Sequence, residues 1–330
     1  MEKIRWGILG CGKIANKFAA DLKLVENTEL VAVASRNREK GEEFSKLYDA
    51  RLTFDTYEQL VACKEVDVIY VATPHGFHHE HTLLCLRHGK AVLCEKALAL
   101  NSKQVGEMID TARANKVFLM EAFWTKFIPQ YEKVVELVGS GEIGEVKMLQ
   151  ADFGFRAMEP TPQRLFDPAL GGGALLDIGI YPVFLAISFL GRPVEIKATM
   201  QAFSSGVDEQ ISIALKFGNG ALAMLSATFA SETPVAAVIS GTKGYIRMDN
   251  RFHNPASTVA LAIGKEQPQP VAVAKEEGYG YQYEARHVSD CLRKGLIESP
   301  VMSHADSLLL IETLDRIRQE CGIRYNADND

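Results

Sequence analysis

Cysteine pairs of the C-x-x-C type are absent from the sequence, although six cysteines are scattered along its 330 residues. Because zinc ribbons and redox motifs need such pairs, we expect isolated, reduced thiols and a cytoplasmic location. Blocks of like charge are also absent and the net charge is −6, which argues against nucleic acid or a membrane surface as a partner. We also expect no apolar stretch of the roughly 18 residues that a membrane span requires.

A Ser/Gly-rich linker, an internal repeat and a low-complexity tract are absent as well. With 330 residues, of which 47% are apolar, the chain is too long for one typical core and apolar enough for two. The pattern of secondary structure changes near residue 121, so we expect one domain over residues 1–121 and a second over 122–330. The C-terminal helix could pack back on the first domain.

The first domain alternates short β-rich runs with segments of helical periodicity. The runs read IRWGIL, ELVAVAS, RLTF, VDVIYVA, AVLCE and VFLME. Alternation of strands and helices predicts a parallel sheet with helices on both faces, which is the doubly wound α/β arrangement of a Rossmann domain.

The second domain has a different pattern. We expect a helix over Pro129–Val138, a long strand over Val146–Phe155 and an apolar helix from about Gly173. Alternating strands follow, with Gly-Asn-Gly at 218–220 as a hairpin turn, and they read EIKATMQAF, EQISIALKF, ALAMLSATF, AAVISG and YIRMDN. This order predicts an α+β domain with a large, mostly antiparallel open sheet, followed by helix over Tyr283–Cys321.

The first strand runs into a G-x-G-x-x-A loop over Gly10–Ala15, and this loop opens a helix. Gly10 permits the tight turn, and Gly12 lets the backbone approach a pyrophosphate. The helix that this loop opens then presents free N–H groups to the phosphates, so Lys13 and Ile14 of the loop are expected to bind the cofactor as well. Glycine turns between a strand and a helix also occur without a ligand, but the strand before this loop and the helix after it favour a dinucleotide-binding domain.

The second strand ends at Ser35-Arg36, about 20 residues beyond the loop, where a ribose-reading residue is expected. An acidic residue there would bind the 2′-hydroxyl of NAD, whereas a hydroxyl followed by arginine suits the 2′-phosphate of NADP. NADP is therefore the expected cofactor and NAD the alternative. Arg36 and Arg38 could instead be ordinary solvated residues at the start of the next helix.

The fifth strand ends at Glu95-Lys96, at the sheet edge where open α/β folds bind ligands, although these two residues could also form a surface ion pair. With the glycine loop and Thr73-Pro74 after the fourth strand, the chain resembles the glucose-fructose oxidoreductase, inositol dehydrogenase and rhizopine-catabolism (Gfo/Idh/MocA) family. The hallmark of that family is Glu-Lys-Pro at this point. Ala97 replaces the proline here, so the sequence leaves open whether the preceding peptide bond is cis.

Two further segments, 121–129 and 171–181, resemble the branch of dimeric dihydrodiol dehydrogenases and NADP-dependent D-xylose dehydrogenases. Inositol-type members carry D-x-G-x-H-x-x-D in the second segment, where this chain has Tyr181 for the histidine and Phe184 for the last acid. The resemblance implies that Lys96 and Tyr181 form the catalytic pair. Asp177, four residues before Tyr181 on the same helical face, would hold a second substrate hydroxyl.

Four histidines follow Thr73-Pro74, at positions 75, 78, 79 and 81. They could bind a metal, but no cysteine or carboxylate cluster completes a site in the sequence, so we expect none. The resemblance implies instead that His75 and His78 line the nicotinamide and substrate pocket. The cofactor-binding residues are then Gly10, Gly12, Lys13, Ile14, Ser35, Arg36, Thr73, Pro74, His75, His78, Glu95 and Lys96.

The resemblance also implies aromatic pocket walls at Trp124 and Phe153, with Arg156 as a weaker candidate that could equally be a surface charge. We therefore expect an NADP-dependent dehydrogenase that acts on a sugar such as D-xylose or on a trans-dihydrodiol. An NADP-binding sensor or scaffold without turnover, and a reductase of a ketose or anhydro sugar, are the alternatives. The open sheet is expected to form a homodimer or a higher homo-oligomer.

Overall fold

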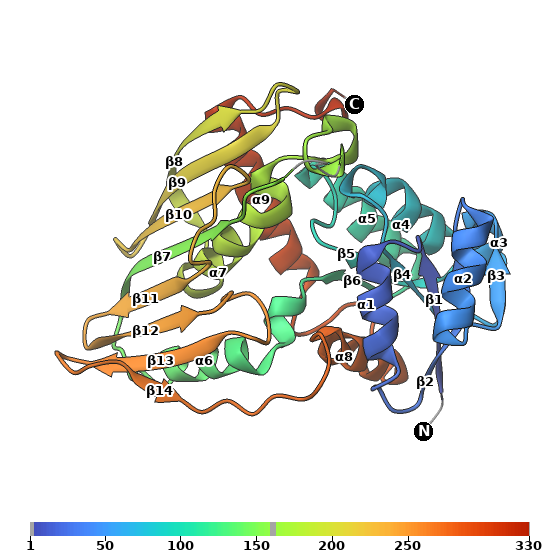
Figure 1. Ribbon diagram of the computed structural model, residues 1–330, viewed down its shortest axis with the longest axis horizontal. Coiled ribbons are helices and arrows are strands. Elements are labelled where there is room, and N and C mark those ends of the chain that lie inside the picture. The colour runs from blue at the N-terminus through green and yellow to red at the C-terminus, as the bar shows by residue number, and fades with distance from the viewer. Residues whose placement is uncertain (1–2, 159–162, 330) are drawn as a thin grey trace. The chain divides into compact units, whose positions relative to one another are not determined.

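The computed structural model describes residues 3–158 and 163–329 (Figure 1). The chain forms two compact units, each made of two segments. The first unit comprises Met1–Phe127 and Glu276–Leu308, and the second comprises Ile128–Lys275 and Leu309–Asp330. A C-terminal segment therefore belongs to the first unit, and the division falls within the last long helix, α9 (His304–Cys321).

The first unit contains a six-stranded sheet in the order β3-β2-β1-β4-β5-β6, and all of its strand pairs are parallel. The strands are β1 (Ile4–Leu9), β2 (Thr28–Ala34), β3 (Leu52–Phe54), β4 (Val68–Val71), β5 (Ala91–Glu95) and β6 (Leu119–Ala122). Every residue of β4 and β5 is buried, as expected for apolar strands covered on both faces. The strand order reverses between β1 and β4, which is where such sheets bind ligands.

Helices connect these strands, and one from the end of the chain joins them. They are α1 (Lys13–Leu22), α2 (Arg38–Tyr48), α3 (Tyr57–Ala62), η1 (His75–Phe77), α4 (His78–Arg87), α5 (Ser102–Asn115), η2 (Trp124–Phe127) and α8 (Tyr281–Arg293). α8 packs on α1, where the buried Asp21 carboxylate accepts the N–H groups of Tyr279 and Tyr281 at 2.8–2.9 Å. These bonds explain why the segment before α8 belongs to the first unit.

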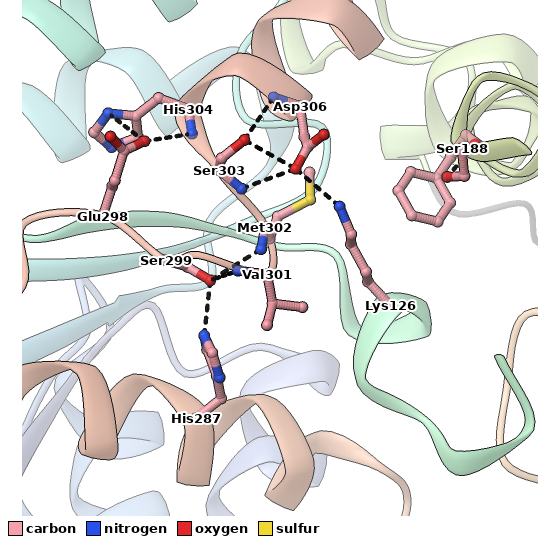
Figure 2. Close-up of polar contacts among 11 residues, drawn as sticks. Lys126, Ser188, His287, Glu298, Ser299, Val301, Met302, Ser303, His304 and Asp306 are labelled. Carbon is pink, nitrogen blue, oxygen red and sulfur yellow. Dashed lines mark hydrogen bonds and ion pairs between the residues drawn. The ribbon is translucent and has the colours of Figure 1, made fainter. Parts of the chain in front are cut away.

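The start of α9 is fixed by a polar network (Figure 2). Ser303 and Asp306 form a reciprocal cap, because the Ser303 hydroxyl accepts the Asp306 N–H at 3.1 Å and the Asp306 carboxylate accepts the Ser303 N–H at 3.0 Å. Lys126 of η2 also donates to Asp306 at 2.9 Å. Nearby, His287 of α8 hydrogen-bonds to the Ser299 hydroxyl at 2.7 Å, so the loop between α8 and α9 is held in its middle as well as at the start of α9.

The second unit contains an eight-stranded sheet in the order β14-β13-β12-β11-β7-β10-β9-β8. Only β7 and β10 pair in parallel among its described strands. The strands are β7 (Val146–Gly154), β8 (Pro193–Ala202), β9 (Asp208–Phe217), β10 (Leu222–Thr228), β11 (Ala237–Gly241), β12 (Gly244–Asp249), β13 (Thr258–Ile263) and β14 (Gln269–Val271). The predicted fold class, a Rossmann domain followed by an α+β domain with a large open sheet, is confirmed.

The helices of this unit lie on one face of the sheet (Figure 1). These helices are α6 (Pro129–Gly139) and α7 (Ile180–Leu190), and the unit also contains the short turns η3 (Gln163–Leu165), η4 (Pro168–Leu170), η5 (Leu175–Gly179) and η6 (Asn326–Asp328). α7 packs on β7 and β10. Along β9, Ile211, Ile213 and Leu215 are buried and the residues between them are exposed. The opposite face of the sheet is therefore open in this unit.

The segment Pro168–Leu190 corrects one expectation. Its 23 residues are long and apolar enough to cross a membrane, so the expectation that no stretch reaches this length is wrong. However, 83% of its most apolar window is buried inside the protein. Such burial is typical of the central helix of a folded domain, and the apolar composition is explained by packing against the sheet.

Candidate active site

The β1–α1 loop leaves room for a ligand next to the backbone. Gly10 has a φ of +98°, and a Cβ atom there would lie 3.2 Å from the Ala72 carbonyl oxygen, so the chain itself requires this glycine. Gly12 is different, because a Cβ atom there would lie 3.9 Å from the same oxygen, at ordinary contact distance. Among the described residues, no side chain caps α1. The lack of a side chain at Gly12 and the uncapped helix start both fit a bound pyrophosphate.

The first turn of α1 follows the expected pattern. Lys13 is exposed and Ile14 is half-buried, whereas Ala15 is fully buried. The small side chain of Ala15 therefore allows the helix to pack closely against the sheet, which keeps its N-terminus at the carboxyl end of β1.

The two arginines after β2 have different environments. Ser35 is buried, and its hydroxyl accepts the Asn37 N–H at 3.2 Å. Arg38 pairs with Glu42 at 2.8 Å, and both side chains are largely exposed. The Arg36 guanidinium instead lies over the Phe77 ring, 5.6 Å from its centroid. Arg36 is thus held beside the end of β2 by an aromatic face, while Arg38 is engaged in a surface ion pair.

The carboxyl end of β5 is held by a hydrogen bond from the neighbouring strand β4. The buried Tyr70 hydroxyl of β4 donates to the Glu95 carboxylate, and burial raises the pKa of Tyr70 well above its usual value. Lys96 follows directly and is half-buried at the sheet edge. The peptide bond between Lys96 and Ala97 is cis, which answers the question that the missing proline left open.

His78 connects the segments that follow β4 and β5. It is 0% exposed, and its ring nitrogens lie 2.8 Å from the Ala97 carbonyl and 2.7 Å from the Thr73 carbonyl. Burial lowers the pKa of His78 to about 4, although the two carbonyls oppose this shift. His75 is also buried, with its ring 5.6 Å from that of His78. His78 therefore holds the backbone on which Lys96 is carried.

The other two histidines of this run have separate partners. His79 pairs with Glu107 at 3.0 Å, and His81 hydrogen-bonds to the Thr73 hydroxyl at 3.0 Å. Within residues 3–158 and 163–329, no group of three or more His, Cys, Asp or Glu side chains could hold a metal ion.

Trp124 is supported by a residue that the sequence did not single out. Its ring stacks on that of Tyr281, with centroids 4.8 Å apart and planes at 11°. Tyr281 begins α8, which is far from Trp124 along the chain. Nothing in the local sequence predicts this pair, because it depends on the return of α8 to the first unit.

In the second unit, Tyr181 lies in the first turn of α7 within a group of three rings. The His253 ring is 4.7 Å from that of Tyr181 and 4.3 Å from that of Phe153, and the Phe153 and Tyr181 rings are 5.7 Å apart. His253 is 6% exposed. Sequence reasoning missed His253, because a single histidine in a loop after a strand carries no motif.

Asp177 precedes Tyr181 on the π-helical turn η5. Its carboxylate accepts a hydrogen bond from Arg164 at 3.0 Å, and it is 8% exposed. Half of the Arg164 side chain is exposed. Arg164 was also missed by the sequence analysis, whereas Arg156, the weaker candidate, is exposed and its N–H donates to Glu232. The second unit therefore places Tyr181 against two aromatic rings, and it places Asp177, on the preceding turn, in an ion pair with Arg164.

Comparison with known proteins identifies the family. Residues 4–123 match the model of the oxidoreductase family with an NAD-binding Rossmann fold, and residues 131–247 match the Gfo/Idh/MocA C-terminal domain. This chain belongs to the Gfo/Idh/MocA family. The predicted family and the predicted NAD(P)-dependent oxidoreductase are both confirmed.

Several family members are similar over their whole length. The trans-1,2-dihydrobenzene-1,2-diol dehydrogenase of Xenopus tropicalis is 40% identical over 97% of this chain and 99% of its own. The enzyme of that name from Mus musculus is 39% identical over 98% of this chain and 99% of its own. Among solved structures, a 3-ketoreductase from Actinomadura kijaniata in complex with NADP and TDP-benzene is 28% identical, with a TM-score of 0.86 over 97% of this chain and 98% of that one. The aldose-aldose oxidoreductase from Caulobacter crescentus complexed with glycerol is 26% identical, with a TM-score of 0.88 over the same shares.

Proposed function

We propose that this family member oxidises a hydroxyl-bearing carbon of a sugar or a vicinal diol and uses NADP as the hydride acceptor. The observation that carries the proposal is Tyr181, whose ring packs against Phe153 and His253 on the helix that also carries Asp177. A tyrosine with a neighbouring carboxylate suits a substrate with two hydroxyls, because one group can exchange a proton while the other accepts a hydrogen bond. The names of the relatives, which include diol dehydrogenases and an aldose oxidoreductase, support this substrate class.

We assign the residues of the first unit to three parts of the cofactor. We assign the pyrophosphate to the loop of Gly10, Gly12, Lys13 and Ile14, and the 2′-phosphate to Ser35 and Arg36. We assign the nicotinamide end to Thr73, Pro74, His75, His78, Glu95 and Lys96. NADP, when bound, supplies a nicotinamide ring that accepts a hydride. NAD would lack the phosphate that Arg36 is proposed to bind.

The chain's own residues would move the proton. In this proposal, the positive charge of Lys96 would favour the ionised form of Tyr181, which would then take the proton of the reacting hydroxyl. The C–H electron pair of the same carbon leaves as hydride, the O–H electron pair becomes the second bond of the carbonyl, and Tyr181 becomes neutral. Asp177 would accept a hydrogen bond from a second hydroxyl, and Trp124 and Phe153 would pack against the carbon skeleton. The reverse reaction, reduction of a ketose or anhydro sugar, uses the same groups with the opposite proton movement.

A substrate panel tests this function. Pentoses, hexoses and trans-diols are incubated with NADP or NAD, and the absorbance of the reduced nicotinamide is followed. Turnover of at least one polyol or diol with NADP is expected. Tight NADP binding without turnover of any member in either direction would contradict the proposal and favour a sensor or scaffold.

The open face of the eight-stranded sheet suits a second copy of the chain. It carries Leu222, which is 44% exposed, and Met224, which is 55% exposed. A hollow of about 720 Å³ is lined on this sheet by small residues such as Ser212, Ala214 and Ser226. Exposed apolar side chains beside a shallow hollow are typical of a self-complementary interface. We propose a homodimer formed through this face, or a higher oligomer that contains it.

The state of the thiols supports a cytoplasmic location. All six cysteines are free, and Cys85, Cys94 and Cys291 are buried. Burial raises the pKa of Cys11 to about 11, so its thiol is protonated at neutral pH. A chain with six unpaired thiols suits a reducing compartment.

A further inference from the structure

A buried carboxylate lies at the start of the helix that carries Tyr181. Asp208 is the first residue of β9 and is 0% exposed. Its Oδ2 atom accepts the N–H of Leu175 at 2.6 Å. Leu175 begins η5, which continues into α7, so this carboxylate accepts one of the N–H groups that a helix start leaves without a partner within the helix.

The loop before η5 is shaped to fit this carboxylate. A Cβ atom on Gly173 would lie 2.3 Å from Asp208 Oδ1, and Gly173 has a φ of +116°. Both observations require glycine at this position. The backbone of the loop therefore passes directly over Asp208, and the position of η5 depends on this contact.

A residue near the C-terminus holds a second peptide of this loop, two peptide units before the one bound by Asp208. The buried Tyr325 hydroxyl donates to the Gly172 carbonyl at 2.6 Å. Tyr325 is itself held, because its N–H donates to Asp328 at 2.9 Å and Arg318 of α9 donates to Asp328 at 2.7 Å. Two buried side chains, one from β9 and one from the C-terminal segment, thus fix the Gly172–Gly173 peptide and the Ala174–Leu175 peptide, which are separated by one peptide unit and lead into η5.

We propose that Asp208 and Tyr325 are positioning residues, which fix the start of the η5–α7 helix and thereby the location of the Tyr181 hydroxyl. This inference rests on the proposed role of Tyr181 in proton transfer. A π-helical turn is rare and is found at functional sites when its surroundings hold it in place. The η5 turn lies between the anchored peptides and Tyr181, so loosening either anchor would move the tyrosine without removing it.

The charge of Asp208 makes this anchor sensitive to pH. Burial raises the pKa of Asp208 to about 7, and the Leu175 N–H and the Arg318 guanidinium oppose that shift. Among the residues that the structure describes, Cys321 of α9 and Tyr325 of the C-terminal segment also interact electrostatically with Asp208. Proton uptake near neutral pH would weaken the bond to Leu175, because a carboxylate accepts a hydrogen bond more strongly than a neutral acid.

Two conservative variants test the proposal. Asp208→Asn keeps the shape and an acceptor oxygen but removes the charge, and Tyr325→Phe removes only the hydroxyl. With the fastest substrate of the panel, each is expected to lower kcat by about tenfold or more, because small displacements of a reacting group have large effects. The Kd for NADP should stay unchanged, and the kcat–pH profile should lose its transition near pH 7 in Asp208→Asn alone. The controls are Asp249→Asn and Tyr245→Phe, which make the same chemical changes on β12 of the same sheet. Both should leave kcat and the Kd for NADP unchanged.

A double variant separates positioning from a general structural role. If Tyr325 acts through the Tyr181 hydroxyl, then Tyr181→Phe/Tyr325→Phe should be no slower than Tyr181→Phe alone. The inference would be overturned if kcat of the double variant fell by the product of the two single decreases, because the two residues would then act independently. It would also be overturned if Asp208→Asn and Tyr325→Phe both folded and both had a normal kcat. A normal rate for Tyr181→Phe itself would instead contradict the proposed function.

Hydrogen exchange provides a readout that needs no substrate. The amides of residues 173–181 should exchange at least about tenfold faster in Tyr325→Phe, and in Asp208→Asn if that variant folds, than in the control variants. Unchanged exchange in Tyr325→Phe would overturn the inference even if no substrate were found.

Discussion

The imidazole ring of His253 lies against the ring of Tyr181, with centroids 4.7 Å apart and planes at 40°. It also stacks on the Phe153 ring, with the two planes at 24°. His253 therefore lies beside both Tyr181 and Phe153, which are proposed to contact the substrate. Aromatic contacts of this kind contribute about 0.5–1.5 kcal/mol beyond the area that they bury. His253 should therefore help to fix the Tyr181 ring in one orientation.

Replacing His253 by leucine tests this contact. His253→Leu keeps the bulk but removes the flat ring, so kcat/KM should fall by roughly 2- to 12-fold, which corresponds to that contact energy. His253→Phe keeps the stacking and should lose less. Steady-state kinetics with saturating NADP measures both variants. Equal kcat/KM for the His253→Leu variant and the unmodified protein would mean that the stack has no role.

Cofactor choice is predicted to depend on Arg36 and not on Arg38. Arg36→Ala should weaken NADP binding by about 1.5–3 kcal/mol, roughly 10- to 150-fold in Kd, because a charged hydrogen bond to the 2′-phosphate is lost, and it should leave NAD binding nearly unchanged. Arg38→Ala is the control, since Arg38 pairs with Glu42. Fluorescence titration with both reduced cofactors measures the effect. Equal losses for NADP and NAD would contradict the assignment.

Oligomer formation is predicted to use the open face of the second sheet. Met224→Lys places a charge on that face and should convert the dimer to a monomer, because a buried, unpaired ammonium is strongly unfavourable. Leu47→Lys changes a similarly exposed apolar side chain on α2 and should leave the dimer intact. Light scattering at micromolar concentration measures the mass. A monomeric unmodified protein would refute the interface.

Stability is predicted to depend on pH through Glu121. Burial raises the pKa of this carboxyl from 4.5 to about 7, although hydrogen bonds from Ser307 and the Leu98 N–H oppose the shift. The folded state therefore keeps a proton that the unfolded chain releases above pH 4.5, so the stability that this group contributes at low pH is lost as the pH rises through about 7.

Glu121→Gln removes that dependence while keeping an acceptor for the Leu98 N–H, which lies 2.9 Å from Oε1. Its urea midpoint should rise relative to that of the unmodified protein between about pH 5 and pH 8. The exposed Glu142→Gln is the control and should show a constant difference. A constant difference for Glu121→Gln as well would show that the carboxyl does not titrate in this range.

The sequence was most informative where local pattern determines structure. The alternation of strand runs with helical segments predicted the parallel sheet of the first domain, and the G-x-G-x-x-A loop predicted that a helix follows it, which is α1. Contacts between distant segments were not predictable. The stacking of Tyr281 on Trp124 requires α8 to return to the first unit, and the His253 contact requires a loop after β12 to meet α7.

The apolar segment Pro168–Leu190 illustrates a different limit. Composition and length are the same for a membrane span and for a central core helix, so only packing against the sheet distinguishes them. The Arg164–Asp177 ion pair was missed because the sequence around Asp177 does not indicate which arginine lies beside it in the folded chain.

The central claim is that Tyr181 exchanges the proton while Lys96 sets its charge. Lys96→Met should lower kcat and shift its pH dependence, because the positive charge that favours tyrosinate is removed. The most direct measurement is kcat of Tyr181→Phe with saturating NADP and the best substrate of the panel, beside the Kd for NADP. Loss of general acid–base catalysis predicts a decrease in kcat of about 10²- to 10⁴-fold with an unchanged Kd. A kcat close to that of the unmodified protein would remove tyrosine from the mechanism and leave Lys96 or a histidine as the proton carrier.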